Sequence, residues 1–210
     1  MNPPLTLTEK QQQFLRELSR PEVKAVTMLG EAGAGKSTVG LLALLRVAQA
    51  NPGRTLALAC ESRLLLTYGF GDLIRLADGW GVWEQRDAAS SVPCIRFGNG
   101  AQLIGLMETG RAPMPGLPID SAFFDGPIQA DSLRFFSQLL TRALAGMGGN
   151  GKLWLAGGQH RPAWVDTWCG APTVPAACVR MSRADNPHLP GDWDEGVRGA
   201  RCAVRGEGEG

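Results

Sequence analysis

The chain has few of the features that mark membrane, secreted or metal-cage proteins. None of its apolar runs approaches the roughly 20 residues needed to cross a bilayer, and its N-terminus lacks a basic region followed by an apolar core. Its five cysteines, at positions 60, 94, 169, 178 and 202, are odd in number and show neither C-x-x-C nor Cys/His ligand spacing. We therefore expect a soluble, cytoplasmic protein with free thiols, no metal cage and no membrane partner.

The chain also lacks a charge excess that would attract a polyanion over its whole surface. Its formal net charge is +1, so any contact with nucleic acid must come from a local patch. A length of 210 residues with 44% hydrophobic content is enough for one α/β domain and hardly enough for two. We expect a single domain over residues 1–200 and a flexible, Gly/Glu-rich tail over residues 201–210.

A complete phosphate-loop motif is present at residues 30–37. The sequence GEAGAGKS fits the pattern G-x-x-x-x-G-K-[ST], with a strand-like run before it and a helix-like run after it, as the motif requires. Lysine is scarce, so chance matches are expected on the order of 0.01 per chain. The predicted nucleotide-binding residues are Gly30, Glu31, Ala32, Gly33, Ala34, Gly35, Lys36, Ser37 and Thr38.

The chemistry of phosphate binding explains this spacing. Glycines let the backbone turn tightly and aim its N–H groups inward, and the first turn of the following helix adds unpaired donors and a positive dipole end. Lys36 can reach the β- and γ-phosphates of ATP, while the Ser37 hydroxyl can coordinate Mg²⁺. We therefore expect ATP and Mg²⁺ as cofactors.

The remaining pattern predicts a mainly parallel sheet with helices on both faces, because strands and helices alternate. An antiparallel hairpin is expected near residues 92–107, where Asn99-Gly100 supplies the positive φ angles of a tight turn. Residues 79–91 and 108–118 are expected to be loops. Helices are expected over residues 6–18, 37–50, 62–77 and 127–146, and further strands over residues 23–29, 55–60, 119–125, 152–156 and 175–181.

A phosphate-loop NTPase needs a second carboxylate at the end of a nearby apolar strand, where it holds the metal ion through water. Asp125 ends the run Ser121-Ala-Phe-Phe-Asp125 and fits that position. Ser37 and Asp125 are therefore the expected metal site. The alternative is that Asp125 only caps a helix opened by Pro127.

Several short segments keep the order and spacing of one known family. Besides the phosphate loop, they are Gln11–Leu15, Ile95–Ile104, Gly110–Gly116, the strand ending at Asp125, and Ala184–Pro190. Together they resemble the ATPase domain of phage terminase large subunits, the motors that move viral DNA into an empty capsid. The resemblance covers about residues 6–195. It implies a three-layer α/β fold of the RecA-like phosphate-loop NTPase class.

Taken residue by residue, the resemblance assigns several roles. It implies that the region from Gln11 to Gln13 contacts adenine, and our chosen contact is Gln13. It makes Asp125 the Walker B aspartate and gives Lys36 and Ser37 to phosphate and Mg²⁺. The strand end that finishes at Gln159 would couple hydrolysis to movement, with Gln159 as a candidate sensor of the γ-phosphate.

The sequence departs from the terminase pattern at two catalytic positions. Terminases usually carry a glutamate directly after the Walker B aspartate, and this chain has Gly126 there. An arginine that the family often carries inside the phosphate loop is replaced by Ala32. The family's nuclease domain does not follow in this sequence, so we expect no DNA cleavage by this chain alone.

Two residues are candidates for the missing catalytic functions. Glu61 follows the strand after the phosphate-loop helix, where RecA-type ATPases carry their catalytic glutamate, and it can orient the attacking water. Arg111 can act as an arginine finger, in cis or toward a neighbouring subunit, or it can be a solvated loop charge. Without a water-positioning residue, turnover falls by roughly 10²–10⁴, so a nucleotide-binding scaffold with little hydrolysis stays open.

The expected function is that of an ATPase subunit in a motor that packages viral double-stranded DNA. A helicase-like ATPase, a phage-assembly ATPase and a weakly hydrolysing scaffold are the alternatives. The motor interpretation implies a homo-oligomeric ring, because one domain cannot hold a duplex while it releases and rebinds it. It also implies a portal protein and a separate nuclease or small terminase subunit as partners, in the host cytoplasm if the chain is phage-encoded.

Overall fold

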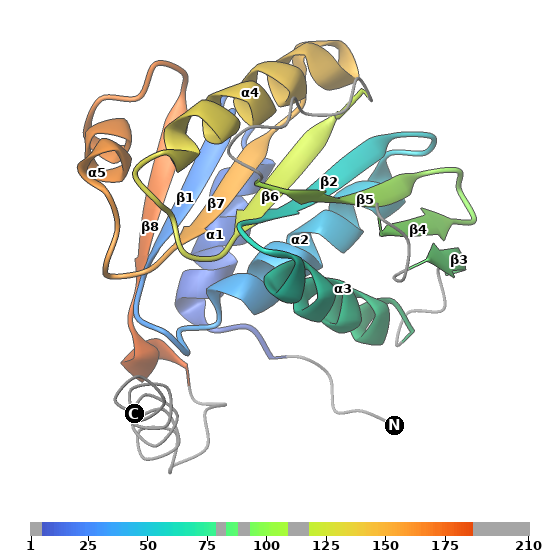
Figure 1. Cartoon of the computed structure of the whole chain (residues 1–210), viewed down its shortest axis with the longest axis horizontal. Helices are drawn as coiled ribbons and strands as arrows, with labels where there is room; N and C mark the ends of the chain where they lie inside the picture. Colours follow the sequence, from blue (N-terminus) through green and yellow to red (C-terminus); the bar gives the residue numbers. More distant parts are fainter. Residues whose placement is uncertain (1–5, 79–82, 88–92, 109–117, 187–210) are drawn as a thin grey trace, which may run out of the picture.

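The computed structural model describes residues 6–78, 83–87, 93–108 and 118–186, which form one eight-stranded sheet in the order β3-β4-β5-β2-β6-β7-β1-β8 (Figure 1). The six strands from β5 to β8 in that order are parallel. β4 pairs antiparallel with β5, and β3 pairs antiparallel with β4. The strands are β1 (Ala25–Gly30), β2 (Thr55–Cys60), β3 (Trp83–Asp87), β4 (Cys94–Phe97), β5 (Gln102–Met107), β6 (Ser121–Asp125), β7 (Leu153–Gly157) and β8 (Ala176–Met181).

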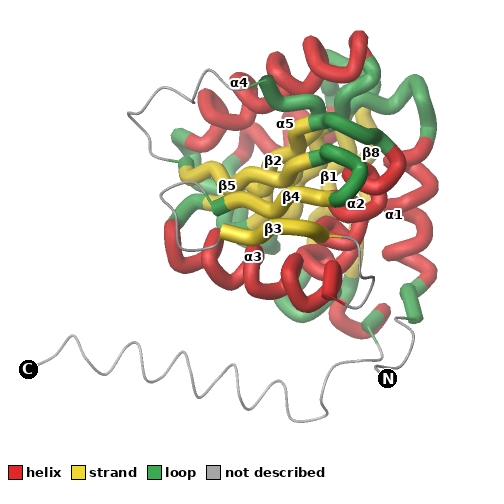
Figure 2. The backbone as a smooth tube through the Cα atoms, turned by 90° about the vertical axis from the view of Figure 1, so that its right-hand side faces the viewer, coloured by secondary structure: helices red, strands yellow, loops and turns green. Residues whose placement is uncertain are grey.

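Helices cover both faces of the sheet and give the described chain three layers (Figures 1 and 2). Buried side chains of α1, α2 and α3 form the core on one face, and those of α4 and α5 form a second core on the other. The α-helices are α1 (Glu9–Ser19), α2 (Lys36–Ala50), α3 (Arg63–Asp78), α4 (Ser132–Ala145) and α5 (Ala163–Gly170), and the short 3₁₀ helices are η1 (Gly146–Gly149) and η2 (Arg183–Asp185).

The predicted α/β class, the mainly parallel sheet and the hairpin between β4 and β5 are confirmed. The start of α1 is a capping box: the Gln11 N–H donates to Thr8 Oγ1 at 3.2 Å, and the Thr8 N–H donates to Gln11 Oε1 at 2.9 Å. β2 is buried along its whole length, as a strand covered by helices on both faces must be. The predicted tail over residues 201–210 lies outside the described residues.

Three elements differ from the sequence-based expectation. Residues 83–87, expected in a loop, form β3, because an edge strand needs backbone pairing on one side only and tolerates a polar sequence. α4 begins at Ser132 and not at Pro127, because residues 126–131 first turn away from the end of β6. α5 is an addition to the predicted elements, since eight residues are too few to show a clear helical period.

The tip of the hairpin packs against the end of α2. Residues 98–101 connect the two strands, and the Gly100 N–H donates to the Phe97 carbonyl at 2.9 Å, which closes the tight turn. The Asn99 side-chain amide donates to the carbonyls of Ala48 and Gln49, at 3.0 and 3.1 Å. These carbonyls belong to the last turn of α2, where the Asn51 N–H also donates to the Ala48 carbonyl at 3.4 Å, so Asn99 acts as an additional side-chain cap.

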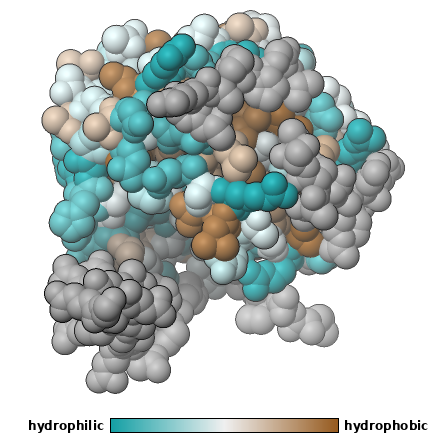
Figure 3. Space-filling model, in the orientation of Figure 1, coloured by the Kyte–Doolittle hydropathy of each residue, from teal (hydrophilic) through white to brown (hydrophobic). Residues whose placement is uncertain are grey.

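The described residues expose few large apolar side chains. Figure 3 shows a face that is mostly teal and white over the described residues, with small brown groups between them. The exposed large apolar residues among those described are Leu64, Tyr68 and Leu133. No helix in the described part of the chain combines the length and the apolar character that a membrane span needs. The described cysteines, Cys60, Cys94, Cys169 and Cys178, are free thiols, as expected.

α2 approaches the sheet closely at Gly40. Trp154 of β7 is fully buried, and its indole N–H donates to the Gly40 carbonyl at 3.1 Å. The Trp154 ring stacks on Phe123 of β6, with ring centroids 6.2 Å apart. A Cβ atom at Gly40 would lie 2.2 Å from the Phe123 ring, well inside van der Waals contact. This glycine therefore sets the distance between α2 and the sheet.

We predict that Gly40→Ala lowers the free energy of unfolding by about 1–3 kcal/mol, because the added methyl group overpacks the helix–sheet contact. This loss outweighs the gain of about 1 kcal/mol in helix propensity. Gly71→Ala in α3 is the matched control, because a Cβ there meets no atom within 4 Å. Urea unfolding should show the control to be as stable as wild type or more so. A Gly40→Ala variant as stable as Gly71→Ala would contradict the close contact.

Candidate functional site

The polar residues singled out by the sequence gather at one edge of the sheet, where the parallel strands end. The loop 30–37 follows β1, Glu61 follows β2, Asp125 ends β6, and Gln159 lies just beyond β7. The strand register places Asp125 beside Ala156 of β7. Because the carboxyl ends of parallel strands meet at one edge, residues far apart in the chain come together here.

The loop 30–37 turns back over the end of β1 and leads into α2. Gly30, Gly33 and Gly35 have φ angles of 153°, 83° and 78°. At Gly35 a side chain is excluded twice over: the φ angle is left-handed, and a Cβ would lie 2.3 Å from Gln11 Nε2. Ala34 is buried, whereas Ala32 and Thr38 are more open to solvent.

Two side-chain amides brace this loop from outside. Gln11 of α1 is buried, and its Nε2 donates to the Gly35 carbonyl at 3.2 Å. The Asn186 Nδ2 donates to the Gly33 carbonyl at 2.6 Å. Gln13, the predicted adenine contact, accepts a hydrogen bond from the Lys10 ammonium at 3.2 Å. The structure thus brings Gln11 and Asn186 to the loop, and both belong to segments that the sequence resemblance had already marked.

The Lys36 ammonium lies against the backbone of its own loop. Its Nζ donates to the Gly30 carbonyl at 3.0 Å and to the Glu31 carbonyl at 2.6 Å. Burial lowers the pKa of Lys36, while the negative charges of Asp125 and Glu31 act in the opposite direction. A half-buried cation that donates hydrogen bonds at the mouth of a backbone loop is suited to binding an oxyanion.

Ser37 and Asp125 meet across the sheet edge. The Ser37 hydroxyl donates to Asp125 Oδ1 at 2.9 Å. Burial raises the pKa of Asp125 to about 6, against the lowering effects of the Ser37 hydrogen bond and the Lys36 charge. Hydroxyl and carboxylate oxygens are ligands that Mg²⁺ accepts. Among the described residues, no group of three or more His, Cys, Asp or Glu side chains could hold a metal ion.

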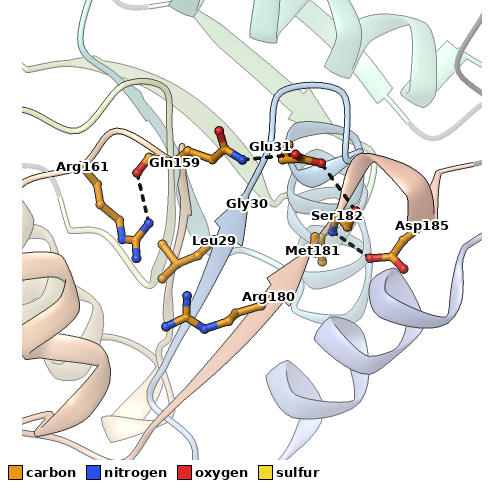
Figure 4. Close-up of a pocket in the computed structure, with 9 residues that line it drawn as sticks. All are labelled: Leu29, Gly30, Glu31, Gln159, Arg161, Arg180, Met181, Ser182 and Asp185. Carbon is orange, nitrogen blue, oxygen red and sulfur yellow. Dashed lines mark hydrogen bonds between the residues drawn. The ribbon is translucent and has the colours of Figure 1, made fainter.

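The Glu31 carboxylate joins the loop to two neighbouring strand ends. Its Oε1 accepts from Gln159 Nε2 at 3.2 Å, and its Oε2 accepts from the Arg183 N–H at 2.9 Å and the Ser182 hydroxyl at 3.5 Å. Glu31, Gln159 and Ser182 line a cavity of about 380 Å³ together with Arg161 and Arg180. Figure 4 shows these five residues around the end of β1. The phosphate-loop pattern leaves position 31 unspecified, so the motif held no signal for these contacts.

Glu61 belongs to a chain of polar contacts beyond Asp125. The Gln129 Nε2 donates to Glu61 Oε1 at 3.1 Å, and the Ser132 hydroxyl donates to Glu108 Oε2 at 2.9 Å. The Gln129 N–H donates to the Ser132 hydroxyl at 2.9 Å, so the two contacts are joined. Glu61 after β2 and Glu108 after β5 thereby hold the segment that leads from β6 into α4.

Gly126 stands where the resemblance implies a glutamate. Its φ angle is 136°, a conformation that residues with a side chain rarely adopt. A Cβ at this position would lie 3.3 Å from Leu65 Cδ1. The backbone after Asp125 is therefore shaped for glycine. Arg111, the other candidate for a catalytic charge, lies outside the described residues.

Solved structures of phage large terminases have the same fold as this chain. A large terminase from a thermophilic bacteriophage matches with a TM-score of 0.69 and 16% identity, over 92% of this chain and 50% of that one. The ATPase domain of the Thermus phage P74-26 large terminase matches with a TM-score of 0.62 and 13% identity, over 84% and 81%. The HK97 bacteriophage large terminase matches with a TM-score of 0.67 and 16% identity, over 98% and 48%.

These comparisons confirm the predicted RecA-like fold of terminase ATPase domains. The first of these proteins, the thermophilic bacteriophage terminase, has been solved in complex with ADP and with ATP-γ-S. This chain spans about half the length of that protein and of the HK97 protein. No protein-family model matches the sequence, and no curated protein matches it.

We predict that Glu108→Gln makes stability less dependent on pH. Burial raises the pKa of Glu108 above its ordinary value of 4.5, helped by Asp131 and Glu61 and opposed by the Ser132 hydrogen bond. The unfolded chain therefore gives up this proton at a lower pH than the folded chain, and wild type loses stability as pH rises through that window.

At pH 7.5, Glu108→Gln should be more stable than wild type by about 0.5–1 kcal/mol, because glutamine carries no charge and still accepts from Ser132. The difference should shrink toward pH 4, where both side chains are neutral. Urea unfolding over pH 4–7.5 measures it, with the exposed Glu9→Gln as control. A difference that stays constant with pH, or grows toward pH 4, would be incompatible with the raised pKa.

Proposed function

We propose that this chain binds and hydrolyses MgATP at the edge formed by loop 30–37 and Asp125. The observation that carries the proposal is the hydrogen bond of 2.9 Å between Ser37 and Asp125, a carboxylate on which the Lys36 charge also acts. A cationic group, a hydroxyl and a carboxylate next to a glycine-rich loop are the parts that a phosphate-loop NTPase uses. The complexes of the thermophilic bacteriophage terminase with ADP and ATP-γ-S support the nucleotide.

In this proposal the chain's own groups position and neutralise the triphosphate. The loop amides and the start of α2 hold the phosphate oxygens, and Lys36 exchanges its carbonyl partners for the β- and γ-phosphates. Ser37 and Asp125 hold Mg²⁺, which supplies charge neutralisation for the phosphates. Gln159 contributes a polar amide from the end of β7, the strand that lies between β1 and β6.

Glu61 is the proposed residue that orients the attacking water. It follows β2, the strand next to β6, so its carboxylate belongs to the same sheet edge as Asp125. Its hydrogen bond from Gln129 holds the carboxylate in place without supplying a positive charge. Gly126 cannot provide this function, and its backbone conformation disfavours any replacement that could.

The cellular role that fits this site is an ATPase subunit of a motor for packaging viral double-stranded DNA. Support comes from the fold shared with the three phage large terminases. The role requires a homo-oligomeric ring on a portal protein, together with a small terminase subunit or a separate nuclease, in the host cytoplasm. A scaffold with little hydrolysis is the second candidate, because Gly126 and Ala32 stand where terminases carry catalytic side chains.

We predict that Lys36→Ala weakens ATP binding by roughly 10–100-fold, because it removes the ammonium that lies against the loop. Asp125→Asn should leave binding without Mg²⁺ unchanged and reduce the gain that Mg²⁺ gives. Titration calorimetry with ATP-γ-S measures both effects. Lys24→Ala is the control, since that ammonium donates to the Gly149 carbonyl at the end of η1. Equal affinities of wild type and Lys36→Ala would rule out phosphate binding at this loop.

Glu61→Gln should reduce ATP turnover by roughly 10²–10⁴ while the affinity for ATP-γ-S stays within about twofold of wild type. Steady-state phosphate release measures turnover, and Glu9→Gln on the exposed start of α1 is the control. Equal turnover by wild type and Glu61→Gln would remove Glu61 from the mechanism. Negligible turnover by wild type would favour the scaffold.

The same assay with double-stranded DNA and portal protein tests the motor role. Stimulation of wild-type turnover by either component supports a packaging motor. Absence of stimulation by both would leave the motor role without support, and unwinding of duplex DNA would favour a helicase-like ATPase. Glu61→Gln should show no stimulation, because the water-positioning step is lost in every complex.

A further inference from the structure

The Glu31 carboxylate occupies an unusual position for an acidic group. It lies within the loop proposed to bind a polyphosphate. Repulsion between the carboxylate and the phosphates would cost electrostatic free energy there. Three donors surround it: the Gln159 amide, the Ser182 hydroxyl and the Arg183 N–H. The Arg183 hydrogen bond is the main cause of the lowered pKa of Glu31, so the group stays ionised. All three donors come from segments that follow other strands of the sheet.

The contact with Glu31 determines how the Gln159 side chain is oriented. An ionised carboxylate only accepts hydrogen bonds, so the NH₂ end of the Gln159 amide must face it. That NH₂ group has a second N–H, which remains available for an anionic oxygen. If Glu31 were absent, the amide could turn its carbonyl oxygen toward the phosphates and repel them. Glu31 therefore selects the orientation of Gln159 that can recognise a phosphate.

The segment that follows β8 returns to the loop at two points. Ser182 and Arg183 donate to Glu31, and Asn186 donates to the Gly33 carbonyl. Ser182 is also the N-cap of η2, and its N–H donates to Asp185 Oδ2 at 2.7 Å. A loop that shifts on binding a ligand would shift this segment with it, because the hydrogen bonds at both points would have to follow or break.

We propose that Glu31 is a positioning residue that couples the state of the bound nucleotide to residues 182–186. When a γ-phosphate takes the free N–H of Gln159, the amide is held against Glu31, and the carboxylate is held against Arg183 and Ser182. With a diphosphate, Gln159 has no such partner and the contacts loosen. The inference rests on the proposed nucleotide binding and adds a route by which the γ-phosphate is sensed outside the loop.

Hydrogen exchange of the Arg183 amide tests this coupling directly, since that N–H donates to Glu31. NMR should record it for wild type, Glu31→Ala and Glu31→Gln, each without nucleotide, with Mg-ADP and with Mg-ATP-γ-S. Glu22→Ala is the matched control: it also removes a carboxylate, but that group pairs with Arg20 away from the site. Calorimetry on the same samples gives the affinity ratio for ATP-γ-S over ADP.

In wild type, ATP-γ-S should slow exchange of the Arg183 amide relative to ADP. Glu31→Ala should speed this exchange roughly tenfold, abolish its dependence on nucleotide, and lower the ATP-γ-S/ADP affinity ratio roughly tenfold. The exchange rate and the affinity ratio of Glu31→Gln should lie between those of wild type and Glu31→Ala, because glutamine keeps one acceptor oxygen. Glu22→Ala should match wild type.

Exchange that is equal with ADP and ATP-γ-S in wild type would overturn the proposal. Exchange in Glu31→Ala that still depends on nucleotide would overturn it as well, because the coupling would run through other atoms. A wild type that binds no nucleotide would instead refute the proposed function. In that case, equal Arg183 exchange in nucleotide-free wild type and Glu31→Ala would separately show that the carboxylate does not hold the segment.

Discussion

The hydrogen bond between Ser37 and Asp125 sets the geometry on which the rest of the site depends. Asp125 ends β6, whereas Ser37 lies in the first turn of α2, which follows β1, and β7 lies between β1 and β6. Two strand spacings amount to about 9.5 Å. The Ser37 and Asp125 oxygens are nevertheless 2.9 Å apart. Loop 30–37 must therefore arch across the end of β7, which brings Glu31 within reach of Gln159. The Ser37–Asp125 hydrogen bond thus determines that the ends of β6 and β7 both contribute to the site.

The charges of Asp125, Lys36 and Glu31 explain how this edge of the sheet can favour a cation and still accept a polyanion. Burial works against the ionised form of Asp125, and Lys36 and Ser37 offset that cost only in part. A divalent cation beside Asp125 would favour its ionised form and bring positive charge to the phosphates. The Glu31 carboxylate is stabilised chiefly by the Arg183 N–H, and the Ser182 hydroxyl and the Gln159 amide contribute less. The Glu31 carboxylate is thereby held toward the segments that follow β7 and β8.

Sequence reasoning succeeded where structure is decided by near neighbours in the chain. The loop 30–37 and the apolar run of β2 depend on residues a few positions apart. It failed where long-range pairing decides. β3 is a strand because β4 offers it backbone partners. The contact of Asn186 with Gly33 joins residues 153 positions apart, a relation that no local pattern encodes.

The glycine at position 126 is better explained by geometry than by the simple loss of a catalytic glutamate. Its φ angle of 136° turns the chain sharply at the end of β6. That turn delays the start of α4 and presents Gln129 to Glu61 and Ser132 to Glu108. A side chain at 126 would strain this turn by about 1–3 kcal/mol and disturb both contacts. The conformation that excludes a glutamate after Asp125 therefore also anchors the glutamate that follows β2, which is why Glu61 and Gly126 belong to one arrangement.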